Sequence, residues 1–212
     1  MENKNRLTYR VSAALAGEIL SQKMPIGAKL PPDTDLCEKF QVSRTVLRET
    51  LRVLGAKGLI TAKPRVGTLV AEAKHWALWD PEVLHWLTGA ALSQEALADI
   101  AHHALDMRLA LEPSLAALAS SRASDAAKQQ LQHALRDLQG TPDLAHEQGF
   151  ICCLYDISGN QFAPFASHLA CWAIAQRSTA VPMSHYQALT VAISQGASVE
   201  ARQCAINYLI GE

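Results

Sequence analysis

The chain has 212 residues, of which 49% are hydrophobic and 6% aromatic, and its formal net charge is −1. This composition supports a buried core of one or two domains and excludes a disordered or collagen-like chain. It holds no uninterrupted apolar run of the roughly 18 residues that a membrane helix needs, and its polar N-terminus lacks the apolar part of a secretory signal, so we expect a cytoplasmic protein.

Residues 9–22 carry apolar side chains at helical spacing and predict a first helix. It is expected to end before the Met-Pro-Ile-Gly sequence at residues 24–27, which favours a turn. Two prolines at positions 31 and 32 then set the backbone for a second, short helix over residues 33–40.

Ser43 is a typical N-cap for a third helix over residues 44–57, which Gly58 is expected to end. At about 100° per residue this helix has an apolar and a polar arc. The apolar arc consists of Val46, Leu47, Leu51, Val53 and Leu54. The polar arc consists of Arg44, Thr45, Arg48, Glu49 and Arg52. Three arginines at i, i+4 and i+8 suit a helix that enters the DNA major groove, because guanidinium groups reach guanine edges and phosphates.

Residues 59–70 form two segments of strand-like composition around a Lys-Pro-Arg-x-Gly tip, which predicts a β-hairpin wing. Lys63 and Arg65 supply positive charge at this tip. Gly67 allows the backbone to approach a sugar-phosphate edge closely. We therefore expect the wing to lie beside the third helix on the DNA.

An arginine row by itself is most often only a solvated helix face. Here two helices, a capped arginine helix and a basic hairpin follow in the order of a winged helix-turn-helix, which favours DNA binding. The charge agrees, because residues 1–75 hold 13 Lys and Arg against 7 Asp and Glu, whereas residues 76–212 hold 6 against 13. We predict a DNA-binding domain over residues 1–75. Its predicted DNA contacts are Ser43, Arg44, Thr45, Arg48, Arg52, Lys63, Arg65 and Gly67.

The run Leu-Pro-Pro-Asp at residues 30–33, the segment 36–60 and the wing sequence at 65–70 together resemble the DNA-binding domain of GntR-family transcription regulators. The resemblance spans residues 9–70. It implies that Arg44 and Arg48 contact bases and that Gly67 approaches the groove. Many members have arginine where this chain has Thr34, so the resemblance implies that one common DNA contact is missing.

Residues 76–94 are predicted to form an inter-domain junction. Trp76, Trp79 and Trp86 lie here, and we expect them to pack the two domains together, although filling the core is a compatible alternative. The aromatic stretch resembles the junction in a subgroup of GntR regulators that control the catabolism of sugar acids of the galactonate or gluconate type.

Residues 95–212 are rich in Ala and Leu at helical spacing and contain few strand signals. Breakers at Ser124, 140–142, 158–160 and Gly196 predict an all-α bundle of about six helices, so the whole chain is expected to be mainly α. The landmarks at residues 106–119, 150–160 and 192–209 resemble the helical ligand-binding domain of the FadR subfamily, called the FCD domain. The resemblance implies an effector-binding and dimerisation domain with a short last helix.

Many FCD domains hold a metal with a carboxylate or amide and three histidines. By resemblance these four positions fall on Glu147, Ile151, Tyr186 and Tyr208, of which only the glutamate is a good ligand. We therefore expect neither a metal site nor a cofactor. A bound metal is retained as an alternative, because His146 and His185 each lie one residue from an expected position.

Arg108 aligns with an arginine that faces the effector in this subfamily, and a guanidinium suits a bidentate carboxylate partner. The alternative is an internal salt bridge to Asp106, Glu112 or Glu147. Tyr186 and Tyr208 either hydrogen-bond an effector or fill the space left by the metal. The predicted ligand-binding residues are Arg108, Glu147, Tyr186 and Tyr208.

These features predict a homodimeric repressor that binds a pseudo-palindromic operator and is released by a small, sugar-acid-like carboxylate. One alternative is a constitutive DNA-binding dimer whose helical domain senses nothing, and another is a metal-dependent sensor. An enzyme is the weakest alternative, because Cys152 and Cys153 lie near His146 without an identifiable orienting Asn or Asp. The five cysteines lack CxxC spacing, and we expect reduced thiols.

Overall fold

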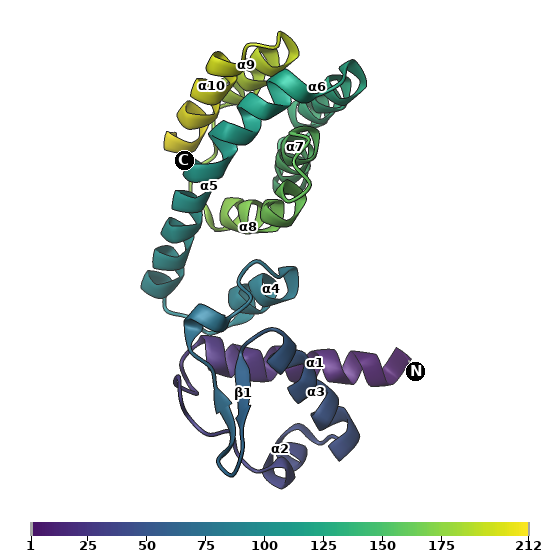
Figure 1. Cartoon of the computed structure of the whole chain (residues 1–212), viewed down its shortest axis with the longest axis vertical. Helices are drawn as coiled ribbons and strands as arrows, with labels where there is room; N and C mark the ends of the chain where they lie inside the picture. Colours follow the sequence, from purple (N-terminus) through teal and green to yellow (C-terminus); the bar gives the residue numbers. More distant parts are fainter. Residues whose placement is uncertain (1, 212) are drawn as a thin grey trace. The chain divides into compact units, whose positions relative to one another are not determined.

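The computed structural model describes residues 2–211, so Met1 and Glu212, the outermost residues of the two predicted domains, lie outside it. The chain divides into two compact units, Met1–Ser93 and Gln94–Glu212 (Figure 1). Among the described residues, no helix combines the length and the apolar character needed to cross a membrane.

The first unit is a small helical domain with one β-hairpin. Its elements are α1 (Glu2–Leu20), α2 (Asp33–Phe40), α3 (Arg44–Ala56), β1 (Ile60–Lys63), β2 (Gly67–Val70), the 3₁₀ turn η1 (Ala73–His75) and α4 (Pro81–Gly89). This is the predicted order of three helices and a hairpin, followed by a helix in the segment that was predicted as a junction. The fold is a winged helix-turn-helix.

Helix α1 starts seven residues earlier than the apolar spacing predicted, at Glu2 instead of residue 9. The polar residues before Leu7 show no apolar periodicity, so the sequence pattern did not predict these first two or so turns of the helix. They extend a helix that is anchored further along by Val11, Leu15 and Ile19, which are buried in the first unit.

The predicted capping of α3 is confirmed. Ser43 has an extended backbone, and its Oγ accepts a hydrogen bond from the Val46 amide at 3.4 Å. On the inner face, Val46, Leu47 and Leu54 are buried. Thr50, which was not assigned to the apolar arc, is also buried, and its hydroxyl has no hydrogen-bond partner among the described residues.

Gly58 follows α3 with φ of 72°, in the left-handed region that favours glycine. The structure adds a second reason for this residue. A Cβ built on Gly58 lies only 1.9 Å from the backbone oxygen of His75, so the chain after the hairpin passes directly over it. No side chain fits at this position without moving the backbone.

The wing is a two-stranded antiparallel sheet with Ile60 opposite Val70 and Lys63 opposite Gly67. Its second strand is also held by the segment before α2. The amide of Leu30 donates to the Thr68 oxygen at 2.9 Å, and the amide of Val70 donates to the Ala28 oxygen at 2.9 Å. The hairpin is therefore fixed to the body of the first unit along the outer edge of β2.

Helix α4 belongs to the first unit, so most of the predicted junction has a defined structure there. The Asp80 side chain caps α4 and also pairs with Lys57 at 2.7 Å. Trp86 is buried, with its ring 6.4 Å from the Tyr9 ring of α1 and 5.6 Å from the Lys57 ammonium. This ring helps to fix α4 within the unit.

The second unit is an all-α bundle, as predicted. Its helices are α5 (Gln94–Arg122), α6 (Asp125–Gly140), α7 (Leu144–Ile157), α8 (Ala163–Gln176), α9 (Met183–Ser194) and α10 (Ser198–Ile210). Helix α10 packs along α5 and α9, and α7 packs against α8 (Figure 1). Phe150, Ile151, Leu154 and Ile193 are at the centre of the core and are fully buried.

Replacing Gly58 with alanine is expected to destabilise the first unit by about 2 kcal/mol or more, because strain at positive φ adds to a backbone clash. The matched control is Gly55→Ala in α3, where a Cβ meets nothing within 4 Å and helix propensity favours alanine. Urea unfolding of the full chain, followed by tryptophan fluorescence, measures both variants. Equal stability of the two variants would contradict the assigned close approach.

Candidate nucleic-acid interface and effector cavity

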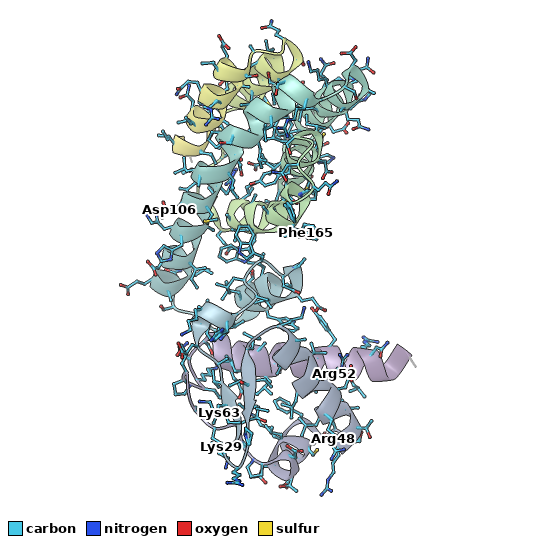
Figure 2. All side chains as sticks on the ribbon, viewed as in Figure 1. Lys29, Arg48, Arg52, Lys63, Asp106 and Phe165 are labelled. Atoms are coloured by element: carbon cyan, nitrogen blue, oxygen red, sulfur yellow. The ribbon has the colours of Figure 1, made fainter. Side chains whose placement is uncertain are left out.

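The arginine row of α3 points away from the core of the first unit. Arg44, Arg48 and Arg52 are exposed, as is Thr45, while Val46 and Leu47 on the opposite face are buried. Figure 2 shows Arg48 and Arg52 along the outer side of α3. The helix therefore presents its cations to solvent and uses its apolar face as an anchor.

The three arginines differ in their partners. Arg52 forms an ion pair with Glu49, with Nη2 2.6 Å from Oε1, and the hydrogen bonds that it donates to this carboxylate raise the pKa of Arg52. Within residues 2–211, no ion pair forms on Arg44 or Arg48. Arg44 and Arg48 are therefore ready to bind an external anion, whereas Arg52 must first leave Glu49.

The wing tip adds a second group of cations. Lys63 and Arg65 are exposed, and Arg65 adopts a left-handed backbone with φ of 64° at the turn. Gly67 has φ of 116°, which favours glycine. The tip is therefore a tight turn that exposes two cations beside a glycine.

Lys29 was not predicted to contribute to this surface. Its backbone bridges to Leu69 of the wing, and its exposed side chain passes over Gly67, where an added Cβ would lie 2.9 Å from Lys29 Cε. The sequence signal was a basic residue directly before the Leu-Pro-Pro run, but only the fold shows that this segment joins the hairpin. Figure 2 shows Lys29 and Lys63 on the hairpin side of the first unit.

The predicted contact Ser43, and Thr34, where a common family contact was predicted to be missing, both have local roles in the first unit. Ser43 Oγ is used to cap α3. Thr34, where many family members have arginine, is on α2 and donates a hydrogen bond to Asp35 at 2.9 Å. The positive charge expected at that place is absent, and Lys29 adds a cation at the neighbouring wing.

In the second unit, Arg108 is completely enclosed. It is 1% exposed, and its Nε is 2.7 Å from Glu112 Oε1, one helical turn further along α5. Its Nη2 donates to the hydroxyl of Tyr208 at 2.7 Å, and the Tyr155 hydroxyl donates to Glu112 Oε1 at 3.0 Å. Of the two interpretations of Arg108, the internal salt bridge with Glu112 is the one for which the structure supplies a contact.

A second ion pair links α7 to the segment after α8. Arg177 contacts Glu147 through both terminal nitrogens at 2.8 Å, and the Tyr186 hydroxyl donates to the same carboxylate. Burial lowers the pKa of Arg177, but the hydrogen bonds and charge of Glu147 outweigh it, so that the pKa is raised. Burial and the Glu147 carboxylate raise the pKa of Tyr186, which keeps its phenol protonated.

Aromatic rings in mutual contact lie between the two ion pairs. The centroids of Tyr186 and Tyr208 are 5.2 Å apart, and those of Phe150 and Tyr186 are 5.3 Å apart in an edge-to-face arrangement. The sequence predicted one ligand-binding set of Arg108, Glu147, Tyr186 and Tyr208. The structure places these residues in two adjacent polar clusters. Arg108 pairs with Glu112 in one and Glu147 pairs with Arg177 in the other, and neither partner was in the predicted set.

A cavity of about 350 Å³ opens at the second cluster. Glu147, Arg177 and Tyr186 line it, together with apolar side chains such as Ile174 and Met183. Arg108 and Tyr208, which were also predicted to bind ligand, are not among its lining residues. The prediction missed Arg177, because a single arginine after a helix carries no periodic signal and only the fold brings it to Glu147.

The four positions that resemble a metal site do not fit a metal. Ile151 has no donor atom, the Tyr186 hydroxyl donates to Glu147, the Tyr208 oxygen accepts from Arg108, and Glu147 is held by Arg177. His146 pairs with Asp143 at 2.7 Å at the start of α7. Within the described part of the chain, no three His, Cys, Asp or Glu residues form a group suited to a metal ion.

Comparison with known proteins identifies related sequences. Residues 7–70 match the family described as "Bacterial regulatory proteins, gntR family". The chain is 30% identical over 172 residues to the "Uncharacterized HTH-type transcriptional regulator YieP" of Escherichia coli (strain K12), over 77% of this chain and 73% of that protein. It is 31% identical over 131 residues to the "Galactonate operon transcriptional repressor" of the same organism, over 62% of this chain and 56% of that protein.

The fold also matches a solved structure. "Streptococcus agalactiae GntR" superposes with a TM-score of 0.53 and 21% identity, over 96% of this chain and 97% of that chain. At this identity the likeness is one of fold. It covers the winged helix-turn-helix and the helical bundle together.

Replacing Glu112 with glutamine is expected to destabilise the second unit by about 3–5 kcal/mol, because it leaves the Arg108 charge buried without its counter-ion. The control is Asp106→Asn, on the exposed side of the same helix, which should change stability by no more than about 0.5 kcal/mol. Urea unfolding of both variants measures the difference. A Glu112→Gln variant as stable as the control would show that the buried ion pair is not structural.

Proposed function

Since the chain belongs to the GntR family of bacterial regulatory proteins and is a DNA-binding transcriptional regulator, we propose that it is a repressor in which α3 reads the operator and the bundle binds a small carboxylate effector. A regulator of this kind acts where the chromosome lies, which supports the expected cytoplasmic location. The observation that carries the proposal is the exposed row of Arg44 and Arg48 on a helix whose opposite face is buried.

In this proposal Arg44 and Arg48 enter the major groove and donate hydrogen bonds to base edges or phosphates. Thr45 and Arg52 extend the same surface, with Arg52 exchanging Glu49 for a phosphate. The amide end of α3, capped by Ser43, faces the backbone of the duplex. Because these contacts neutralise phosphates, affinity falls as salt rises.

The wing contributes the second part of the interface. Lys63 and Arg65 at the tip neutralise phosphates, and Gly67 lets the strand approach the sugar-phosphate edge. We add Lys29 to this group, because its side chain passes over Gly67 and supplies a cation where Thr34 supplies none. A homodimer presents two such surfaces to successive half-sites of a pseudo-palindromic operator.

The cavity beside Glu147 and Arg177 is the proposed effector site. A carboxylate ligand competes with Glu147 for the guanidinium of Arg177, which is well suited to bidentate binding of carboxylates. Ser178 and Thr179 also line the cavity and offer hydroxyls to a polyhydroxylated ligand. The similarity to a protein named as a galactonate operon repressor supports a sugar acid as the class of effector.

A constitutive DNA-binding dimer is the second candidate. The observation that favours it is that Glu112 and Arg108, like Glu147 and Arg177, already satisfy each other without a ligand. In that case the bundle serves only dimerisation, and no carboxylate changes its stability.

Arg48→Ala is expected to weaken operator binding by about 10- to 100-fold, because one guanidinium contact to a base edge contributes about 1–3 kcal/mol. The operator is selected from random duplexes with the unaltered protein, and affinity is measured by fluorescence anisotropy. Arg136→Ala, an exposed arginine of α6, is the control for loss of one positive charge. Unchanged affinity of Arg48→Ala would refute the assignment of α3 as the reading helix.

A sugar acid such as galactonate is expected to raise the melting temperature of the protein and to release it from the operator, because it binds the folded state. Arg177→Gln should abolish both responses while leaving DNA binding without ligand intact. The thermal shift is measured over a panel of sugar acids and simple carboxylates. A panel without any shift would favour the constitutive candidate.

A further inference from the structure

Two cysteines face each other across the contact between α7 and α8. The sulfur atoms of Cys152 and Cys171 are 3.4 Å apart, and both side chains are partly exposed. The two helices are also linked by Gln148 of α7, whose side-chain amide donates to the Cys171 backbone oxygen at 2.9 Å. The pair is therefore set by the packing of α7 against α8, and both residues are partly buried.

The two thiols have different acidities. The hydrogen bond from Cys171 lowers the pKa of Cys152 to about 6 against the opposing effect of burial, and the Ser167 hydroxyl also lowers it, while Asp156 opposes it. The same contact and burial raise the pKa of Cys171, with Glu112 adding to the rise and Arg108 opposing it. Of the two thiols, Cys152 is therefore the one that ionises more readily.

Cys153 provides an internal comparison. It is the next residue on α7, yet burial and Asp156 raise its pKa to about 11. Neighbouring positions on one helix point about 100° apart, so Cys153 faces away from Cys171. The pKa shifts of Cys152 and Cys153 are therefore opposite because only Cys152 contacts Cys171 of α8.

We propose that Cys152 and Cys171 form a peroxide-reactive dithiol that closes into a disulfide between α7 and α8. The Cys152 thiolate attacks one oxygen of hydrogen peroxide, the O–O bond breaks, and the leaving hydroxide takes a proton to become water. Cys171 then attacks the resulting sulfenic sulfur, the S–O bond breaks, and the hydroxyl leaves with a proton as a second water. The two thiols lose two electrons and two protons in total, and the peroxide gains them.

The geometry requires little movement for this step. The sulfurs must approach from 3.4 Å to about 2.05 Å, a change within the reach of side-chain rotation and small helix shifts. The new bond restrains α7, which carries Glu147, against α8, which ends next to Arg177. Oxidation therefore restrains two of the elements that line the cavity, whatever the cavity binds.

The test uses the full-length protein, first reduced and freed of reductant, then treated with a stoichiometric amount of hydrogen peroxide and alkylated. Intact mass and peptide mapping should show the loss of two hydrogen atoms, a Cys152–Cys171 cross-linked peptide and alkylation of the other three of the five cysteines. Dithiothreitol should reverse the change. A map in which Cys152 and Cys171 stay separately alkylated, or pair with other cysteines, overturns the proposal.

Variants separate the two steps. Cys171→Ser should leave a sulfenic acid at Cys152, which is captured by dimedone, whereas Cys153→Ser should form the disulfide like the unaltered protein. At pH 7 the Cys152 thiol should react with iodoacetamide about tenfold faster than the Cys153 thiol. Equal labelling of the two residues, or loss of the disulfide in Cys153→Ser, counts against the pair. If a variant fails to fold, the map of the unaltered protein decides alone.

Discussion

The amphipathic division of α3 is the constraint on which the rest of the account depends. Ser43 fixes where the helix starts, and the start decides which side chains face inward. Leu47 and Leu54 on the inner face of α3 are fully buried. Arg44 and Arg48 lie on the opposite face and are therefore exposed to solvent. Burial of the leucines supplies stability, and in the proposed function the exposed arginines supply recognition, so that folding and DNA binding would use opposite faces of one helix.

The second unit encloses charged side chains in its interior, whereas α3 exposes its arginines to solvent. It buries Arg108 fully and Arg177 partly and gives each a bidentate glutamate, with tyrosine hydroxyls completing the hydrogen bonds. Ion pairs of this kind contribute little net stability compared with apolar packing, but losing one partner is costly. The cluster that opens to the cavity is the one in which a ligand carboxylate can take the place of Glu147.

The sequence predicted most of the first unit, because its elements are short and each is marked by local chemistry such as the Ser43 cap, the prolines before α2 and the glycine after α3. It missed features that depend on distant segments. Lys29 joins the wing only through strand pairing, Gly58 is also required by the backbone of His75, and Arg177 meets Glu147 only when α8 packs on α7. Separation along the chain, rather than residue type, made these contacts unpredictable.

Protection of individual arginines by DNA is the most direct measurement of the central claim. Phenylglyoxal modifies exposed guanidinium groups, and mass spectrometry locates each modified residue with and without the selected operator. The account predicts that bound DNA protects Arg44 and Arg48 and leaves Arg136 as reactive as before. Equal modification of all three in the bound complex would contradict the claim that the arginine face of α3 contacts the duplex.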